Sequence, residues 1–226
     1  MHNRIIQLTE DGSHTIAIPE LNVTYHSKHG ALQESMHVFI HAGLDYFKYC
    51  NPLQNETINI FEVGFGTGLN ALVSLVYAIE YNLQINYQTI ELYPLLSDEA
   101  HNLNYAFLTN QNLKTTFYAM HNCDWNKRIE LHQLFSFKKV KESLLYFKTT
   151  EQFNIIYFDA FDPTVQPELW TEDIFKKMYE LLYTNGLLIT YCSKGSVQRA
   201  MKAAGFTIEK LKGPPGKREI IRAIKI

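Results

Sequence analysis

Runs of apolar residues alternate with helix-like periodicity along most of the chain. Apolar runs bounded by turn residues predict strands, and apolar residues three and four positions apart predict amphipathic helices between them. The predicted strands cover residues 58–63, 85–92, 129–135, 154–158 and 186–192. The predicted helices cover residues 69–81, 94–107, 140–147 and 171–182. Strands that alternate with crossover helices indicate an α/β fold with a mainly parallel sheet.

The two ends of the chain depart from this alternation. Residues 16–18 and 21–25 form short alternating segments around Pro19, which predict a small β appendage before a lead-in helix that includes Met36 and Phe47. At the other end, residues 206–211 and 219–226 alternate on either side of a Gly-Pro-Pro-Gly-Lys turn and predict an antiparallel hairpin. We expect residues 1–54 to form the appendage and lead-in helix, and residues 55–226 to form one continuous folding unit.

Composition narrows the class of protein. With 226 residues and 46% hydrophobic side chains, the chain has enough apolar material for one ordinary folded domain. No apolar run approaches the roughly 20 residues that cross a bilayer, and no export signal follows Met1. Cys50, Cys123 and Cys192 are scattered, as in reduced proteins, and the histidines form no recognisable metal set. A cytoplasmic location without a metal or a membrane is expected.

The charge is unevenly distributed. The net charge of −2 combines nine basic and two acidic residues from Gly186 onward, a balance of +7, with −9 in the rest of the chain. A basic C-terminal segment is able to bind a polyanion, because phosphate contacts depend on local charge. A solvated face that balances an acidic body explains the same pattern.

The sharpest motif follows the first predicted parallel strand, in residues 62–70 with the sequence Glu-Val-Gly-Phe-Gly-Thr-Gly-Leu-Asn. Glycines let a backbone turn tightly and approach a ligand closely, while the start of the following helix offers free N–H donors. The spacing differs from that of dinucleotide and Walker loops, which disfavours nicotinamide and ATP. The candidate cofactor-binding residues here are Glu62, Gly64, Phe65, Gly66, Thr67, Gly68 and Asn70.

Two acids complete the predicted cofactor site. Glu91 closes the next strand, where a carboxylate can accept hydrogen bonds from a ribose diol. Glu62, just before the first glycine, can meet an α-amino group in a charge-assisted hydrogen bond. Together with the glycine loop, these acids favour S-adenosylmethionine. A tight turn flanked by two surface acids is the alternative interpretation.

Asp159 and Asp162 follow the fourth predicted strand. Ligands of open α/β sheets bind beyond the carboxyl ends of the strands at the switch in strand order, where the first and fourth strands lie side by side. Both acids should therefore face the glycine loop. A carboxylate there can orient an incoming amine and receive its proton, which makes Asp159 the candidate catalytic residue. For Asp162, starting a turn before Pro163 is the plain alternative.

These motifs and several other stretches carry a family resemblance. The additional stretches are residues 29–39, 90–95, 158–163, 166–171, 186–193, 197–199, 203–206 and 213–219. From about residue 25 to the end, the chain resembles the methyltransferase part of the MnmC family, which completes the aminomethyl modification of wobble uridine in tRNA. The C-terminal hairpin is also typical of the S-adenosylmethionine-dependent methyltransferase fold.

The resemblance implies a function and a set of partners. The fold would be a class I Rossmann-like methyltransferase sheet, the methyl donor S-adenosylmethionine, and the acceptor 5-aminomethyl-2-thiouridine within tRNA. Phe161 and Asp162 would then meet the substrate, and Lys217 and Arg218 would contact phosphates of the anticodon stem-loop. Phe65, Phe161 and Trp170 are candidates for stacking on the base, with core packing favoured for Trp170. The FAD-dependent oxidase half of bifunctional members is not found, so a separate oxidase is expected upstream.

The sequence departs from the family pattern at one place, and two alternative functions remain open. The family usually has a Gly-Asp pair after the third strand, but residues 136–139 occupy that place here, and Asp124 substitutes only if residues 115–120 are the third strand. The first rival is an aminopropyltransferase of the spermidine synthase type, which shares an Asp-x-x-Asp-Pro sequence like that of residues 159–163. The second is a non-catalytic RNA-binding module with a degenerate nucleotide pocket.

Overall fold

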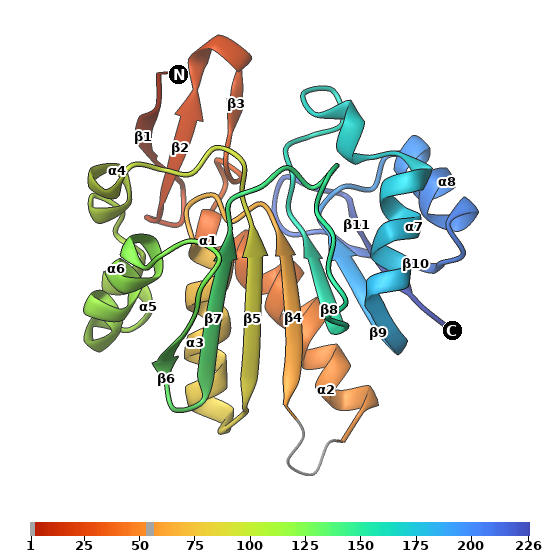
Figure 1. The fold of residues 1–226 in the computed structure, drawn as a ribbon. Helices are drawn as coiled ribbons and strands as arrows, with labels where there is room; N and C mark the ends of the chain where they lie inside the picture. Colours follow the sequence, from red (N-terminus) through yellow and green to blue (C-terminus); the bar gives the residue numbers. More distant parts are fainter. Residues whose placement is uncertain (1–2, 53–56) are drawn as a thin grey trace.

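An eight-stranded sheet forms the centre of the protein (Figure 1), in a computed structural model that describes residues 3–52 and 57–226. Its strand order is β10-β11-β9-β8-β4-β5-β7-β6. The strands are β4 (Ile58–Val63), β5 (Ile85–Ile90), β6 (Arg128–His132), β7 (Phe135–Val140), β8 (Phe153–Phe158), β9 (Leu182–Thr190), β10 (Thr207–Lys212) and β11 (Glu219–Ile224).

Pairing within the sheet agrees with the predicted architecture. Strands β7, β5, β4, β8 and β9 run parallel to one another, whereas β6 pairs antiparallel with β7, and β11 pairs antiparallel with β9 and with β10. The predicted C-terminal hairpin is therefore confirmed. Strands β4 and β8 lie side by side, with Ile60 opposite Ile155 and Val63 opposite Phe158. The order of crossovers reverses between these two strands, which leaves an opening beyond their carboxyl ends.

Helices cover both faces of the sheet. The helices are α1 (Ala31–Ser35), η2 (Met36–Asp45), α2 (Tyr46–Cys50), α3 (Leu69–Tyr81), α4 (Ser97–His101), α5 (Tyr105–Thr109), α6 (Lys114–Asn122), α7 (Glu172–Leu181) and α8 (Gly195–Ala203), with short 3₁₀ turns η1 (Pro19–Leu21), η3 (Gln111–Leu113) and η4 (Pro167–Leu169). The predicted lead-in helix is continuous through α1, η2 and α2, and η2 has π-helical geometry. Among the described residues, no helix has the length and apolar character needed to cross a bilayer.

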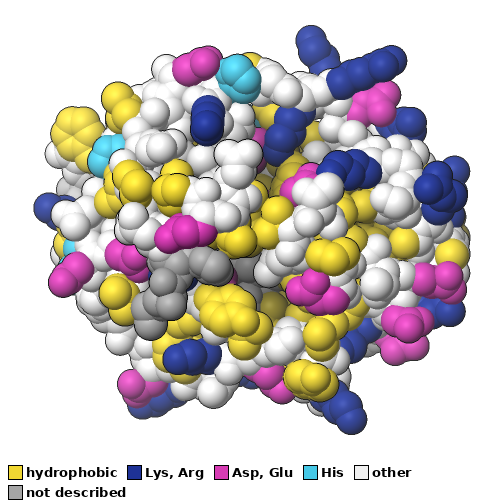
Figure 2. All heavy atoms as spheres, turned by 90° about the horizontal axis from the view of Figure 1, so that it is seen from above, with side chains coloured by type: hydrophobic (Ala, Val, Ile, Leu, Met, Phe, Trp, Pro, Cys, Tyr) yellow, Lys and Arg dark blue, Asp and Glu magenta, His cyan; other side chains and the backbone are white. Residues whose placement is uncertain are grey.

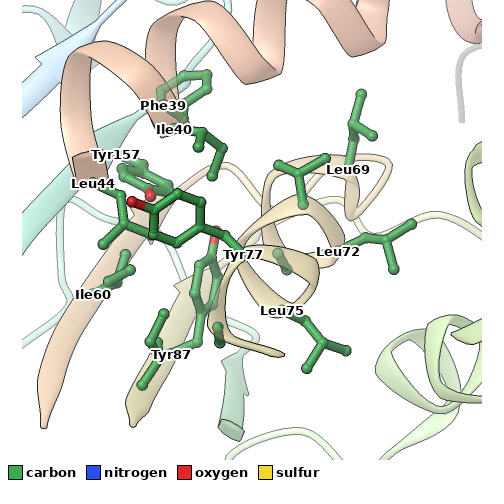
Figure 3. Close-up of a cluster of buried hydrophobic side chains, with 14 of the residues drawn as sticks. Phe39, Ile40, Leu44, Ile60, Leu69, Leu72, Leu75, Tyr77, Tyr87 and Tyr157 are labelled. Atoms are coloured by element: carbon green, nitrogen blue, oxygen red, sulfur yellow. The ribbon is translucent and has the colours of Figure 1, made fainter. Parts of the chain in front are cut away.

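Alternation along the central strands divides the core between the two faces. In β4, Ile58 and Ile60 belong to the cluster that η2 and α3 cover, whereas Phe61 and Val63 belong to the cluster that α7 and α8 cover. Figure 3 shows side chains from η2, α3 and the sheet meeting in the first cluster. Burial on both faces explains why four of the six residues of β4 are apolar, and why the charged Glu62 is unusual within it.

A three-stranded antiparallel sheet lies beyond the carboxyl ends of the central strands (Figure 1). It contains β1 (Ile5–Leu8), β2 (His14–Ile18) and β3 (Val23–Thr24), which correspond to the predicted appendage. Arg4 ties it to the main body, because its guanidinium donates to Glu99 and to the carbonyl oxygens of Tyr93 and Pro94. The predicted boundary between residues 54 and 55 lies outside the described residues.

The prediction for the third parallel strand is wrong. Residues 129–135 lie mostly in β6, an antiparallel edge strand, and the third parallel strand is β7, beside β5. Phe135 and Phe137 are fully buried on β7, while β6 is largely accessible, so only β7 fits a central position. The predicted helix over residues 140–147 is absent from this described segment, since the chain leaves β7 in turns.

Two other segments differ from their predicted form. Residues 115–120, the competing strand candidate, lie within helix α6. The predicted helix over residues 94–107 is interrupted between α4 and α5, where Asn104 has a non-helical backbone and its side chain bonds to the small sheet. Asparagine side chains compete with helical hydrogen bonds, which explains the break.

Candidate functional site

A cavity of about 1210 Å³ opens beyond the carboxyl ends of β4, β5 and β8. Its walls come from the glycine loop after β4, from the loops after β5, β7 and β8, and from residues 23–27 of the small sheet. Viewed from above the strand ends, this face of the molecule is hollowed near its centre, with hydrophobic and acidic side chains at the edge (Figure 2). The predicted position of the site at the β4/β8 switch therefore coincides with a large cavity.

The glycine loop forms the floor of this cavity. Gly64 and Gly66 line it together with Thr67, and both glycines have positive φ angles of 91° and 49°. A Cβ atom on Gly64 would lie 2.8 Å from the backbone oxygen of Asp159, so the loops after β4 and β8 are in direct contact. Only glycine fits this position, because a side chain would meet both the backbone strain and the neighbouring carbonyl.

Phe65 and Gly68 support the loop from behind. Phe65 is only 4% exposed and packs on the rings of Phe137 and His121, with centroids 5.7 Å and 4.9 Å away. His121 bonds to the carbonyl oxygen of Thr67 and leaves no room for a side chain on Gly68. Phe65 is not among the residues that line the cavity, and its contact with a cofactor or a base stays a prediction. Its ring fixes the loop in the core.

Glu91 lies where the diol-binding acid is predicted. Its carboxylate lines the cavity and accepts hydrogen bonds from the backbone N–H groups of Gly66 at 3.0 Å and Tyr93 at 2.8 Å. These bonds hold the side chain against the glycine loop. A carboxylate has about four lone-pair positions, so it retains capacity for further donors from the cavity.

Glu62 does not reach the cavity. The side chain is fully buried on the face of the sheet that carries α3, near Asn70, Thr89 and Tyr87. Burial raises the pKa of the Glu62 carboxyl well above its usual range, and the negative charge of Asp159 adds to this effect. Residue 62 points into the core, and its direct contact with an amino group stays a prediction.

Asp159 faces the cavity and is held by a buried chain of polar groups. Asn70 donates to Asp159 from Nδ2 at 2.9 Å, and Ser35 donates to Oδ1 of Asn70 at 2.5 Å, which fixes the orientation of the amide. Burial, reinforced by the negative charge of Glu34, raises the pKa of Asp159 to about 7, although the Asn70 hydrogen bond opposes this. A carboxyl with this pKa can gain or lose a proton near neutral pH.

Asp162 lies on the same loop in a different electrostatic state. It accepts hydrogen bonds from Lys194 at 2.5 Å and from the backbone and hydroxyl of Thr164. Partial burial opposes ionisation, but these bonds hold the pKa of Asp162 below its usual value. The loop therefore presents one readily protonated acid, Asp159, and one acid with a lowered pKa, Asp162, that also caps a turn.

Of the two aromatic residues Phe161 and Trp170, the first lines the cavity and the second lies in the core. Phe161 lines the cavity, where its ring meets that of Tyr25 edge-on with centroids 5.0 Å apart. Trp170 is buried against Phe158 and Phe175, and its indole N–H donates to the carbonyl oxygen of Phe161. The indole thereby fixes the loop that carries Phe161. Core packing, the interpretation favoured for Trp170, describes its position.

Lys217 and Arg218 also lie in different surroundings. The Lys217 ammonium lines the cavity, 2.8 Å from a carboxylate oxygen of Glu34 and 3.8 Å from the ring centroid of Tyr191. Arg218 is exposed. Lys and Arg side chains gather on the side of this face where Figure 1 places α8 and β10 (Figure 2). Arg218 is thus available to an external polyanion, whereas Lys217 already has partners inside the cavity.

Several cavity residues were missing from the predicted site. Residues 136–139 lie inside β7, so they do not follow the third parallel strand. Glu142 and Ser143 come after this strand, where the family carries its Gly-Asp pair, and they line the cavity wall. Asp124, the other candidate, is exposed and pairs with Lys127. Glu34 and Tyr191 belong to stretches that carry the family resemblance, a signal that could have identified them. Throughout the described ranges, no three His, Cys, Asp or Glu side chains gather as metal ligands.

Comparison with protein families gives one match over more than half of the chain. The family described as S-adenosyl-L-methionine-dependent methyltransferase matches residues 99–226. A curated relative, the tRNA 5-methylaminomethyl-2-thiouridine biosynthesis bifunctional protein MnmC of Burkholderia multivorans, is 26% identical over 98% of this chain. The match covers 35% of that protein, so the chain spans about a third of the length of this relative.

Solved structures show similarity of fold. The crystal structure of MnmC2 from Aquifex aeolicus is similar over 99% of this chain and 70% of its own, with a TM-score of 0.76 and 24% identity. Spermidine synthase from Thermotoga maritima is similar over 100% of this chain and 70% of its own, with a TM-score of 0.60 and 15% identity. Both similarities include the small N-terminal sheet as well as the central sheet, since they extend over almost the whole chain.

Proposed function

Since the chain belongs to the family of S-adenosyl-L-methionine-dependent methyltransferases, we propose that it methylates the aminomethyl nitrogen of 5-aminomethyl-2-thiouridine at the wobble position of tRNA. The product is 5-methylaminomethyl-2-thiouridine. The similarity to the MnmC relatives supports this choice of acceptor. The observation that carries the proposal is a single cavity with a glycine loop and Glu91 on one side and a carboxyl of pKa about 7, Asp159, on the other.

The cavity walls fit S-adenosylmethionine. Gly64 and Gly66 present bare backbone to the cavity, and Glu91 offers carboxylate lone pairs for a ribose diol. Glu142 and Ser143 line the wall after β7, and we propose them as the polar side chains that would meet an adenine amino group. When bound, this cofactor supplies an electrophilic methyl group on a positively charged sulfur. We propose that the glycine loop and Glu91 hold it.

Asp159 acts on the acceptor. A primary amine must be neutral to attack a methyl carbon, and a carboxylate of pKa about 7 can take the proton that the nitrogen gives up. Asp159 would hold the neutral amine toward the methyl group that the bound cofactor would supply, and would keep the proton that the nitrogen gives up. Ser35 and Asn70 keep the Asp159 carboxylate directed at the cavity during these events. Orientation supplies much of the acceleration, because the leaving group is already good.

The tRNA would approach from the open side of the cavity. A wobble base lies in a loop and can turn outward. Because Phe161 lines the cavity, we propose that its ring stacks on this base. Arg218 and neighbouring exposed cations would hold phosphates of the anticodon stem-loop. We further propose that an oxidase reaction supplies the aminomethyl nucleoside and that the methylation takes place in the cytoplasm, where tRNA is found.

The test is methyl transfer to a defined tRNA. The protein is incubated with labelled methyl donor and with tRNA from cells that lack this modification, and the product nucleoside is identified by mass. Label in 5-methylaminomethyl-2-thiouridine supports the proposal. Failure to label tRNA that carries the aminomethyl group, under conditions in which the protein binds the donor, contradicts it.

The same reaction mixture distinguishes the rival activities. The fold similarity to spermidine synthase over the full chain keeps an aminopropyltransferase as the second candidate. That reaction releases methylthioadenosine, whereas methyl transfer releases S-adenosylhomocysteine, and the two are separated by chromatography. A protein that binds tRNA but shows no calorimetric binding of S-adenosylmethionine would instead be a non-catalytic RNA-binding module.

A further inference from the structure

The Lys217 ammonium lies in a set of contacts that suits any alkylammonium group. It is 2.8 Å from Oε2 of Glu34 and 3.8 Å from the centroid of the Tyr191 ring. A carboxylate and an aromatic face are the two environments that bind a desolvated ammonium best. Asp159 lines the same cavity and senses both charges, because Glu34 raises its pKa and Lys217 lowers it.

Each wall of this contact set is held in place. Glu34 is 5% exposed and precedes Ser35, whose hydroxyl orients Asn70 toward Asp159. The Tyr191 hydroxyl donates to the carbonyl oxygen of Ala160, next to Asp159 in the chain. The walls therefore come from helix α1 and from the residues that directly follow β8 and β9. Lys217, in contrast, enters on a flexible four-carbon side chain from the hairpin turn.

We propose that Glu34, Tyr191 and Asp159 form the binding site for the acceptor's alkylammonium group, and that Lys217 fills this site when no acceptor is bound. The inference rests on the proposed function and specifies how the enzyme recognises its substrate. An unmodified wobble uridine has no cation to offer, so it does not replace Lys217. The aminomethyl group does, and the site thereby discriminates between the two nucleosides.

Displacement of Lys217 also brings the acceptor ammonium close to Asp159, the carboxylate that takes its proton. On entry, the ammonium takes the place of Lys217 beside Glu34, so one ion pair replaces another before any proton moves. The ammonium then gives one proton to the Asp159 carboxylate and becomes a neutral amine, while Asp159 becomes a neutral acid. The side chain of Lys217 is 26% exposed in the structure, so its ammonium has a short path to solvent and to the RNA phosphates.

The test compares two anticodon stem-loops that differ only in the aminomethyl group. Their dissociation constants are measured with S-adenosylhomocysteine present, so that no turnover occurs, and expressed as the ratio of unmodified to aminomethyl RNA. We expect Glu34→Gln to lower this ratio about tenfold or more, since an ammonium–carboxylate hydrogen bond is lost. Glu219→Gln is the control. Glu219 lies on the hairpin that carries Lys217, but its carboxylate pairs with Lys210, so this change should leave the ratio unchanged.

Lys217→Met provides an independent result if Glu34→Gln fails to fold. Removing the resident cation should preserve or increase the ratio, even if both RNAs bind more weakly through lost phosphate contacts. A ratio that falls to about one in Lys217→Met would show that Lys217 itself recognises the nucleoside and would overturn the proposal. An unchanged ratio in folded Glu34→Gln would do the same. Failure of the parent protein to methylate aminomethyl tRNA would instead reject the proposed function.

Discussion

Asp159→Asn separates the chemical role of this carboxyl from its structural role. The amide has nearly the shape of the acid and can still accept the hydrogen bond from Asn70 through its oxygen. It cannot take a proton from an amine. We therefore expect the affinity for S-adenosylmethionine to stay within about tenfold and turnover with tRNA to fall by about 10² or more, the usual contribution of a positioned acid–base group.

Although Asp159→Asn should lower turnover, it should raise the stability of the folded protein at high pH. The pKa of Asp159 is about 7 in the folded protein against 3.8 for an unperturbed carboxyl, so its contribution to stability is complete below pH 4 and is lost as the pH rises through 7. At pH 8 the charged carboxylate costs at most roughly 4 kcal/mol relative to the unfolded chain. Asp159→Asn should relieve part of this cost and raise Tm by about 3 °C or more at pH 8, but not at pH 4.

The assays are steady-state methyl transfer from pH 5.5 to 9 and thermal unfolding at pH 4 and pH 8. In the parent protein, turnover should rise with pH around 7 as Asp159 ionises, and this rise should be absent in the variant. Asp162→Asn is the matched control, because its carboxylate is on the same loop but already pairs with Lys194. Turnover of Asp159→Asn equal to that of the parent, in saturating donor and tRNA, would refute the assignment of Asp159 as the proton acceptor.

Three further changes test the cavity wall and the RNA surface. Gly64→Ala places a methyl group 2.8 Å from the Asp159 carbonyl oxygen and should destabilise the fold by about 2 kcal/mol or more in denaturant unfolding. The same change at Gly12, where φ is also positive but space is open, should cost less. Glu91→Gln should weaken S-adenosylmethionine binding about tenfold to hundredfold in calorimetry, and unchanged affinity would place the diol elsewhere. Arg218→Ala should lower the salt dependence of tRNA binding by about one unit of slope; an identical slope would move the phosphate contact to another residue.

The local sequence pattern was sufficient to predict an element where only one secondary structure fitted that pattern. Strand β4 and helix α3 have the predicted limits, because an apolar strand, a glycine turn and a long apolar helix follow each other without a competing segment. The hairpin of β10 and β11 followed from alternation on both sides of a Gly-Pro-Pro-Gly turn. The third parallel strand could not be chosen in this way. Strands β6 and β7 have similar local patterns, and only pairing with β5 makes β7 central.

The same division applies to the site. The positions of Asp159 and Glu91 follow from the rule that functional groups stand at the carboxyl ends of parallel strands. Whether Glu62 points along the strand or into the core depends on its register against α3, and the structure places it in the core.

By itself, the amino-acid sequence determined the class of fold, the glycine loop and the acids that end two neighbouring strands, because these depend on residues close together in the chain. Only the tertiary structure decided which distant side chains share the cavity. Glu34 from the first helix, Tyr191 after β9 and Lys217 from the last turn meet there, although no local pattern relates them. Their contact, and the raised pKa of Asp159 beside them, arise from burial that exists only after the sheet and its N-terminal helix have packed.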